Sequence, residues 1–307
     1  GHFGVVFLVL AMAFIGMTAP AEARPIMFAR TPHVSQGRIV FSYHGDIWIA
    51  SADGANPLRL TANLARNTFP RLSPDGKWVA FTSNRLGNDD VWVMAATGGE
   101  PRQLTFFSGS DAVLGRTPDG QRVLFSTSRG PGAWGSPLYT VSKDGGLPEP
   151  LPMDRAGDGM IRQDGAAVAF NRGAFRFTRK GYRGNSSEDV WVQDLKSKAF
   201  TRLTDIDRKA VKTHVQDVNP MWGADGQVYF VSERDGVFNV WKVAPSGGAA
   251  TQVTTFRKDG VQFASMSPDG KTIAFENEFE IWTLAVPAGT PRKVVVDIEA
   301  DSKENLV

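Results

Sequence analysis

Short runs of apolar residues recur along the chain, each directly after a group of residues that favours a turn. "SPDGKWVAFTS" (73–83) and "SPDGKTIAFEN" (267–277) are nearly the same phrase. Pro-Asp-Gly suits a tight reversal, because Pro presets φ, Asp bonds its own backbone and Gly accepts positive φ. The apolar residues that follow run together or alternate with polar ones, which predicts a half-buried β-strand.

The phrase occurs in six copies along the chain. Its aligned glycines are Gly37, Gly76, Gly120, Gly165, Gly226 and Gly270, separated by 39, 44, 45, 61 and 44 residues. In every copy a variable loop leads from this strand to another one, centred on an aromatic residue, and a further turn leads to a last strand. The segment before the Asp-Gly turn supplies one more, so each copy predicts four antiparallel strands.

Four-stranded units that repeat about every 40–50 residues are typical of a β-propeller, in which each unit is one blade around a central channel. We therefore predict an all-β, six-bladed propeller of four-stranded antiparallel blades. A blade cannot bury both faces alone, so its aromatic residue is predicted to pack between neighbouring blades. These interblade aromatics are Trp48, Trp92, Tyr139, Trp191, Trp241 and Trp282. Replacing one of them, as in Trp191→Ala, is expected to cost roughly 3–5 kcal/mol of stability.

The two ends of the repeat region decide how the ring closes. Residues 25–35 supply an innermost strand for the first blade, and residues 291–296 supply the outermost strand of the sixth. Both ends then fall between blades, and no strand is exchanged between the first blade and the last. We predict that the ring closes by packing alone.

An uncharged apolar run, residues 5–17, precedes the repeats. It is too short to span a bilayer comfortably, but it fits the hydrophobic region of a secretory signal peptide, with a small-residue cleavage site at 21–23. The alternatives are an uncleaved membrane anchor and a buried helix. The predicted division is a signal peptide at 1–23, the propeller at 24–296 and the start of a linker to a following domain at 297–307. A signal peptide implies a periplasmic or secreted protein.

The composition excludes several kinds of chemistry. Hydrophobic residues make up 42% of the 307 residues and charged residues 21%, which is typical of a globular protein. The formal net charge of +2 gives no electrostatic reason to expect a nucleic acid partner. The sequence has no cysteine, so disulfides, thiolate catalysis and cysteine-ligated metals are excluded. No cofactor or metal is expected.

The sequence motifs point to turns and loops rather than to catalysis. Neither G-x-S-x-G nor H-E-x-x-H occurs, so no catalytic residue is predicted. Residues 130–135 satisfy G-x-G-x-x-G, but a predicted strand follows them, and we interpret them as a hairpin loop. The acids of the Asp-Gly turns are interpreted as turn formers. The acids before four of the aromatics are expected to bond the backbone or a neighbouring blade; they are Asp46, Asp90, Asp189 and Glu280.

The fourth copy carries an insertion at residues 171–189, in which basic and aromatic residues are interleaved. Such side chains bind anionic ligands, peptide carboxylates or partner domains, and long loops on rigid scaffolds often carry function. The predicted binding residues are Arg176, Arg179, Lys180, Tyr182 and Arg183. The alternative is an extended hairpin with a solvated tip. Replacing the last two arginines and the lysine together is expected to leave the fold intact and to weaken the contact.

Three stretches resemble the amino-terminal six-bladed propeller of the tricorn protease family. Residues 25–54 resemble its opening blade, and residues 73–105 show a blade pattern that is also similar to the periplasmic propeller protein of the Tol system. "YRGNSSEDVW" (182–191) resembles the family's Tyr-Arg-Gly segment before the aromatic of blade four, with Asn185 where a second Gly is usual. The resemblance extends over roughly residues 25–300.

In that family a seven-bladed propeller, a PDZ-like domain and a serine protease domain follow the six-bladed one. The resemblance implies a non-catalytic module of an exported serine peptidase, which acts as a peptide filter or channel and as a scaffold for a homo-oligomer. The implied partners are peptides or unfolded polypeptide and the following domains of the same chain. The alternatives are a stand-alone periplasmic binding propeller of the Tol type and the propeller of a prolyl-oligopeptidase-like hydrolase.

Overall fold

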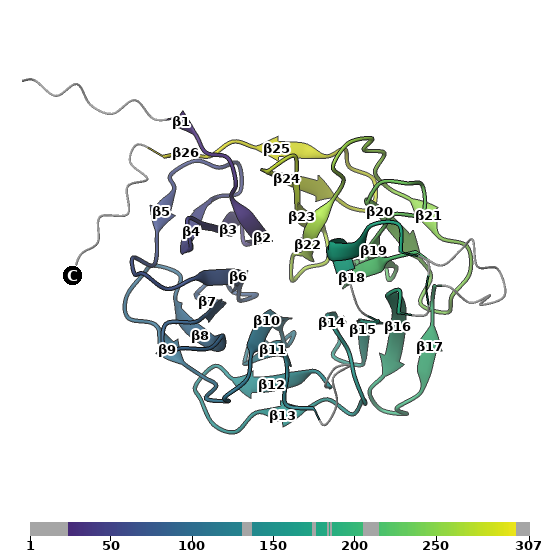
Figure 1. Cartoon of the computed structure of the whole chain (residues 1–307), viewed down its shortest axis with the longest axis horizontal. Coiled ribbons are helices and arrows are strands. Elements are labelled where there is room, and N and C mark those ends of the chain that lie inside the picture. Colours follow the sequence, from purple (N-terminus) through teal and green to yellow (C-terminus); the bar gives the residue numbers. More distant parts are fainter. Residues whose placement is uncertain are drawn as a thin grey trace, which may run out of the picture.

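Six small sheets stand around a central axis and together form a ring (Figure 1). The computed structural model describes residues 24–130, 137–173, 176–182, 184, 186–204 and 215–298. Each of the six sheets has four antiparallel strands, and their order in the sheet follows their order in the chain. The protein is therefore an all-β, six-bladed propeller, as the repeats predicted. The predicted signal peptide lies outside the described residues.

The first strand of each blade lines the channel and the last lies at the rim (Figure 1). Blade one is β2 (Arg30–Ser35), β3 (Arg38–Tyr43), β4 (Asp46–Ser51) and β5 (Leu58–Arg59). Blade two is β6 (Asn67–Leu72), β7 (Trp78–Ser83), β8 (Asp90–Ala95) and β9 (Arg102–Gln103). Blade three is β10 (Asp111–Arg116), β11 (Arg122–Thr127), β12 (Tyr139–Ser142) and β13 (Glu149–Pro150).

The second half of the ring repeats this order. Blade four is β14 (Gly159–Ile161), β15 (Ala167–Arg172), β16 (Asp189–Asp194) and β17 (Phe200–Arg202). Blade five is β18 (Asp217–Trp222), β19 (Val228–Ser232), β20 (Asn239–Val243) and β21 (Thr251–Gln252). Blade six is β22 (Gln262–Met266), β23 (Thr272–Asn277), β24 (Glu280–Ala285) and β25 (Arg292–Val294).

One phenylalanine in the second strand of each blade is completely buried. The six residues are Phe41, Phe81, Phe125, Phe170, Phe230 and Phe275, each with 0% exposed surface. Each packs in a hydrophobic cluster that its blade shares with the blade before it around the ring. In every blade its cross-strand partner is the aromatic residue of the third strand. The deepest wedge between blades is thus a phenylalanine that the sequence analysis did not single out.

The six aromatics named from the sequence share these clusters but lie closer to solvent. Trp48 and Trp92 are buried, whereas Tyr139, Trp191, Trp241 and Trp282 are half-buried. In blades two to five an arginine lies over the aromatic pair, with its guanidinium carbon 4.5–5.6 Å from the centre of the third-strand ring. These arginines are Arg85, Arg129, Arg172 and Arg234. The cation over the ring shields the outer face of each wedge and adds to its stability.

The ring closes with backbone pairing, so the prediction of closure by packing alone was wrong. β1 (Arg24–Pro25) and β26 (Asp297–Ile298) form a two-stranded antiparallel sheet that joins the ends of the described chain. The Ile26 N–H also donates to the Val296 carbonyl at 2.9 Å. Paired segments of two residues leave no hydrophobic period in a sequence, which is why the pattern did not show them. Among the described strands none is exchanged between blades, as expected.

Side chains also join blade six to blade one. Glu276 on β23 accepts hydrogen bonds from Arg30 Nε and from the Thr31 N–H, both at 2.6 Å. Ser265 Oγ donates to the Pro32 carbonyl at 2.6 Å. Burial raises the pKa of Glu276, and the Thr31 N–H and the Arg30 charge counter that shift. These bonds connect residues from opposite ends of the chain, so they hold the ring closed.

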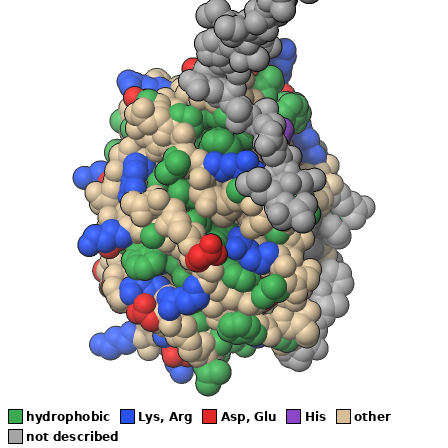
Figure 2. Space-filling view, turned by 90° about the vertical axis from the view of Figure 1, so that its left-hand side faces the viewer, with side chains coloured by type: hydrophobic (Ala, Val, Ile, Leu, Met, Phe, Trp, Pro, Cys, Tyr) green, Lys and Arg blue, Asp and Glu red, His purple; other side chains and the backbone are tan. Residues whose placement is uncertain are grey.

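The outer rim is mixed in chemistry. Figure 2, a view of the side of the ring, shows Lys and Arg side chains interspersed with hydrophobic and polar ones. No helix among the described residues is long and apolar enough to cross a membrane. The charged and polar side chains that suggest a binding site lie instead along the central channel.

Candidate functional site

The turns that open the repeats meet at one end of the central channel and enclose a cavity there. The prolines of three Pro-Asp-Gly turns line it, and Gln163 takes the same place in blade four. These prolines are Pro74, Pro118 and Pro268. The cavity volume is about 70 Å³, which exceeds what a single water molecule needs. The repeated turn therefore both reverses the chain and forms the wall of a small binding cavity.

Each innermost strand places one residue at the same level of this cavity. In every blade it is the residue paired with the one before the buried phenylalanine. The set is His33, Arg71, Gly115, Met160, Met221 and Ser265, and all six line the cavity. A Cβ built on Gly115 would contact no atom within 4 Å. The wall is therefore open on blade three, where the other blades present side chains.

β-Bulges shape the channel wall farther along the innermost strands. In blades one, two, five and six the pairing with the second strand shifts register at a residue with positive φ. These residues are Thr31, Phe69, Asn219 and Phe263, with φ between 48° and 51°. Bulges re-aim side chains, and a non-glycine residue in this conformation stores roughly 1–3 kcal/mol of strain. Backbone strain of this kind is common at functional sites, and here it lies in the strands that line the channel.

Two arginines from neighbouring blades line the cavity, and only one of them is satisfied. Arg71 donates from Nε to the Leu114 carbonyl at 2.8 Å and from Nη1 to the Pro70 carbonyl at 2.9 Å. Arg116 ends β10, and none of its three buried side-chain nitrogens has a hydrogen-bond partner among the described residues. Burial lowers the pKa of each guanidinium to about 10. Both groups are still charged at neutral pH.

His33 adds no charge to the cavity. The Leu72 N–H donates to His33 Nδ1 at 3.2 Å, so the neutral ring carries its proton on Nε2. Burial lowers the pKa of His33 well below its usual value, and the charges of Arg71 and Arg116 lower it further. Both arginines line the same cavity as this ring.

Asp158 is the one carboxylate among the described residues that line the cavity. It accepts hydrogen bonds from Asn219 Nδ2 at 2.6 Å and from the Gly159 N–H at 2.8 Å. Its charge raises the pKa of Arg71 and so counters part of the effect of burial. The lining thus combines two cations with one anion, and its net charge is positive.

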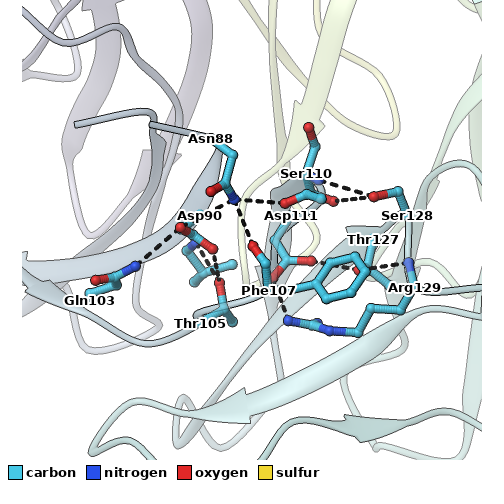
Figure 3. A network of polar contacts seen from close by, with 12 residues as sticks. Asn88, Asp90, Gln103, Thr105, Phe107, Ser110, Asp111, Thr127, Ser128 and Arg129 are labelled. Carbon is cyan, nitrogen blue, oxygen red and sulfur yellow. Dashed lines mark hydrogen bonds and ion pairs between the residues drawn. The ribbon is translucent and has the colours of Figure 1, made fainter. Parts of the chain in front are cut away.

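The acids that precede the aromatics lie at the opposite end of the blades, and one of them, Asp90, belongs to the polar network in Figure 3. Asp90 accepts a hydrogen bond from Thr105 Oγ1 at 3.2 Å. On the next blade Asp111 accepts from Thr127 Oγ1 at 2.5 Å and from Arg129 Nη2 at 2.7 Å. Burial raises the pKa of both carboxyl groups. Each is nevertheless held by several donors, which indicates a structural role.

The same arrangement recurs in other blades. Arg59 pairs with Asp46 in blade one and Arg202 pairs with Asp189 in blade four, both at 2.6 Å. In blade six Lys293 pairs with Glu280 at 2.5 Å. These pairs join side chains of the same blade rather than the backbone or a neighbouring blade, so they do not bear out the expectation from the sequence. These ion pairs recur in several blades, and each charge has a partner. Arg116 occurs at its position in one blade only, and its side-chain nitrogens have no hydrogen-bond partner among the described residues.

A wider groove adjoins the cavity on the face formed by the turns. Residues 34–37 and 267–269 line it between blades one and six, and its volume is about 630 Å³. Pro74 and Pro268 belong to both the groove and the cavity. Small-molecule and peptide sites commonly have volumes of roughly 300–1,000 Å³. A chain lying in the groove would therefore have one end at the mouth of the cavity.

The blade-four insertion lies at the other end of the channel, because β15 runs away from its Asp-Gly turn. Its short 3₁₀ helix, η1 (Arg176–Arg179), lies beside β18 and β22 (Figure 1). The Phe177 ring packs at 5.1 Å from Phe238 and 5.4 Å from Phe263, measured between ring centres. The insertion therefore reaches across blade five to the aromatic residues of blade six.

The predicted binding residues of the insertion are only partly described. Lys180 is exposed and Tyr182 is half-buried. Arg183 and the side chains of Arg176 and Arg179 lie outside the described part of the chain, as do most residues of the 130–135 loop. The described members lie at the opposite end of the channel from the arginine cavity. Their contact role stays a prediction.

Sequence reasoning missed the channel residues altogether. The aligned position four or five residues before each repeat glycine holds a different residue type in every blade except blades four and five, where it is Met. A repeat is recognised from positions that hold the same residue type in every copy, so this variable position gave no signal. The signal that was available is an aligned position whose residue type changes from blade to blade while the positions beside it stay the same. Its meaning depends on the ring, which brings these six residues together in the channel.

Comparison with known proteins points to one family. The profile of the tricorn protease N-terminal β-propeller domain matches residues 26–293. A tricorn protease homolog of Saccharolobus solfataricus is 26% identical over 281 residues, which cover 89% of this chain and 25% of the relative. The crystal structure of the tricorn protease superposes with a TM-score of 0.76 at 25% identity, over 91% of this chain and 27% of that one.

A second similarity is local. The Tol-Pal system protein TolB of Desulfosudis oleivorans is 43% identical over 61 residues, which cover 19% of this chain and 14% of that protein. The tricorn matches extend over nearly the whole chain, whereas this one covers a short stretch. The chain spans about a quarter of the length of the tricorn-type proteins it matches.

Proposed function

This chain belongs to the family of tricorn protease N-terminal β-propeller domains, and we propose that it is the non-catalytic module of a larger exported serine peptidase that admits peptides through its channel. The proposal includes a periplasmic or secreted location, attachment to following domains and assembly into a homo-oligomer. The apolar run at residues 5–17 supports export.

The observation that carries the peptide role is the cavity and groove at the turn end of the channel. The cavity is lined by apolar side chains, including Leu114, Leu124 and Ile161, with a few polar groups among them. Such a combination is typical of sites that bind small molecules or chain ends. The groove beside it has a volume of about 630 Å³ and shares Pro74 and Pro268 with the cavity. Both features fit a peptide better than a folded protein surface.

The alternative is a stand-alone periplasmic binding propeller of the Tol type. The local similarity to TolB favours it, but that similarity covers only 19% of this chain. The downstream reading frame distinguishes the two proposals. A second propeller and a protease domain after Val307 are expected from a tricorn-like protein, whereas an immediate stop codon would favour the Tol-type alternative.

Gly115→Leu tests the peptide role directly. A Cβ at this position has no neighbour within 4 Å, so we expect the leucine side chain to occupy the cavity. We expect the affinity for N-acetyl-trialanine, as acid or amide, to fall at least about tenfold, which is 1.4 kcal/mol, with an unchanged melting temperature. Isothermal titration calorimetry measures the first and differential scanning calorimetry the second.

Ala55→Leu is the control, because it places a leucine at an exposed turn on blade one. Its peptide affinity should equal that of the wild type. If neither form of the peptide bound the wild-type chain, or if Gly115→Leu bound both as well as the wild type, the channel would not be the peptide site.

A further inference from the structure

A second pocket lies at the opposite end of the ring from the turns, between blades six and one. β23 runs away from its Asp-Gly turn, and residues at its far end and in the hairpin that follows line this pocket. The pocket volume is about 110 Å³. Three acids and one arginine belong to the lining: Asp259, Glu276, Glu278 and Arg30. The charge of the lining is therefore negative, whereas that of the cavity at the turn end is positive.

Two of the three acids are open to a ligand. Glu276 is occupied by Arg30 and the Thr31 N–H. Asp259 and Glu278 are exposed, and neither forms a hydrogen bond or ion pair with a residue in the described part of the chain. No group of three acids or histidines among the described residues is placed to hold a metal ion. The pocket is therefore better suited to an organic cation than to a metal.

Asn277, the last residue of β23, also lines the pocket. It is only 4% exposed, and its Oδ1 atom has no hydrogen-bond partner among the described residues. A buried acceptor without a donor is unfavourable, and native structures rarely leave one. A cation that carries N–H groups would supply the donor.

Two other blades show which donor this strand position takes. The residue two places after the buried phenylalanine is Ser83 in blade two and Ser232 in blade five. Each hydroxyl accepts a hydrogen bond from the Nε of an arginine in the hairpin that follows, Arg85 at 3.1 Å and Arg234 at 2.9 Å. Asn277 has the same place in blade six. The repeat therefore identifies this position as an acceptor for a guanidinium group.

Blade six does not supply that arginine itself. Its hairpin consists of Glu278 and Phe279 alone, whereas residues 84–89 and 233–238 form the hairpins of blades two and five. Phe279 follows the buried phenylalanine by four residues, as those arginines do. Its ring is 56% exposed, lines the pocket and lies 5.0 Å from the exposed ring of Phe28. Aromatic faces of this kind stack with the planar guanidinium group.

We propose that the pocket at the end of β23 binds the side chain of an arginine that a partner protein supplies. Its guanidinium group donates to Asn277 Oδ1, pairs with the open carboxylates of Asp259 and Glu278 and lies against the Phe279 ring. This inference goes beyond the proposed function, because the pocket lies at the other end of the ring from the peptide cavity and does not depend on it.

Calorimetric titration of the full chain uses three amidated peptides: N-acetyl-Ala-Arg-Ala, the same peptide with citrulline, the uncharged analogue of arginine, and the same peptide with lysine. We expect the arginine peptide to bind at least about tenfold more tightly than the citrulline peptide, the usual effect of one charge-assisted hydrogen bond. The lysine peptide should bind at least about threefold more weakly than the arginine peptide, because an ammonium group lacks the planar fork of donors.

Two variants remove the acceptors of the pocket. One combines Asp259→Asn with Glu278→Gln, and the other is Asn277→Leu. Each should lower the affinity for the arginine peptide at least about fivefold. The first changes only exposed side chains, and Asn tolerates the positive φ of residue 259, so its melting temperature should equal that of the wild type.

Two further variants are controls. Glu100→Gln neutralises an exposed acid between β8 and β9, far from the pocket in the ring. It should bind the arginine peptide as the wild type does. Gly115→Leu alters the channel cavity and leaves the pocket intact, so it should also bind the arginine peptide with unchanged affinity.

The outcomes separate this inference from the proposed function. Equal binding of the arginine and citrulline peptides, or no binding of either, overturns the arginine pocket and leaves the peptide channel standing. Equal binding of the arginine and lysine peptides overturns the assignment to a guanidinium group. Binding that Gly115→Leu abolishes and the double variant does not change places the peptide in the channel and overturns the pocket. Binding that requires Asp259 and Glu278, while N-acetyl-trialanine does not bind, supports the pocket and contradicts the proposed function.

Discussion

Phe170→Ala is expected to lower the free energy of unfolding by about 3–5 kcal/mol, the usual cost of truncating a fully buried aromatic residue. Phe170 has 0% exposed surface and packs between blades three and four with Leu124, Leu138 and Ile161. Removing its ring opens a cavity between two sheets that cannot collapse, because each sheet is held by its own hydrogen bonds. Denaturant unfolding measures the effect.

Two matched variants locate the wedge within the blade. Trp191 is the cross-strand partner of Phe170 but is half-buried, so Trp191→Ala should cost less, about 1–3 kcal/mol. This revises the larger value expected from the sequence. Phe200→Ala, at the exposed rim of the same blade, should cost under about 1 kcal/mol. A larger loss for Trp191→Ala than for Phe170→Ala would contradict the assignment of the wedge.

Glu276→Ala is expected to destabilise the ring by about 2–4 kcal/mol, because it leaves the buried Thr31 N–H unpaired and breaks the bond to Arg30. Arg30 is 46% exposed, so its ion pair contributes the smaller part. The loss falls at the junction between blades six and one, where the two ends of the ring meet. Hydrogen exchange should show faster exchange in β2 and β23 than in blade three.

Glu276→Gln is the control, because its amide oxygen still accepts from the Thr31 N–H and only the charge is lost. Burial raises the pKa of Glu276, so the folded protein holds this proton more tightly than the unfolded chain does. Stability is therefore expected to fall as the pH rises from the ordinary Glu pKa through the raised value, and this slope should be absent in the Gln variant. An identical pH profile for both proteins would contradict the assignment.

The fold was predictable because its signal repeats. Six turns with the same glycine and six strands with the same aromatic position define the blades in the sequence, and the structure confirms their number. The wedge was assigned to the tryptophans because they are large and regular, although the phenylalanines recur just as regularly two to three residues after the strand begins. Each phenylalanine and its cross-strand partner lie on the same face of the blade, so their burial differs because the second strand lies farther from the rim than the third, and the pattern of one strand does not give that.

The candidate site was not predictable by the same route. Arg116 follows Gly115 in a short strand that looks like the others, and nothing in the local sequence marks either residue. Their significance comes from the ring, which brings one residue of each blade to the same level of the channel. The insertion of blade four attracted attention because it interrupts the repeat, and it lies at the other end of the channel, beyond the end of β15.

The most direct test of this account is a crystal structure of the full chain grown with N-acetyl-trialanine. We predict a peptide lying in the groove between blades one and six and reaching the channel cavity, with its chain passing Pro74 and Pro268. A peptide bound elsewhere on the propeller, with the groove and the cavity empty, would contradict it.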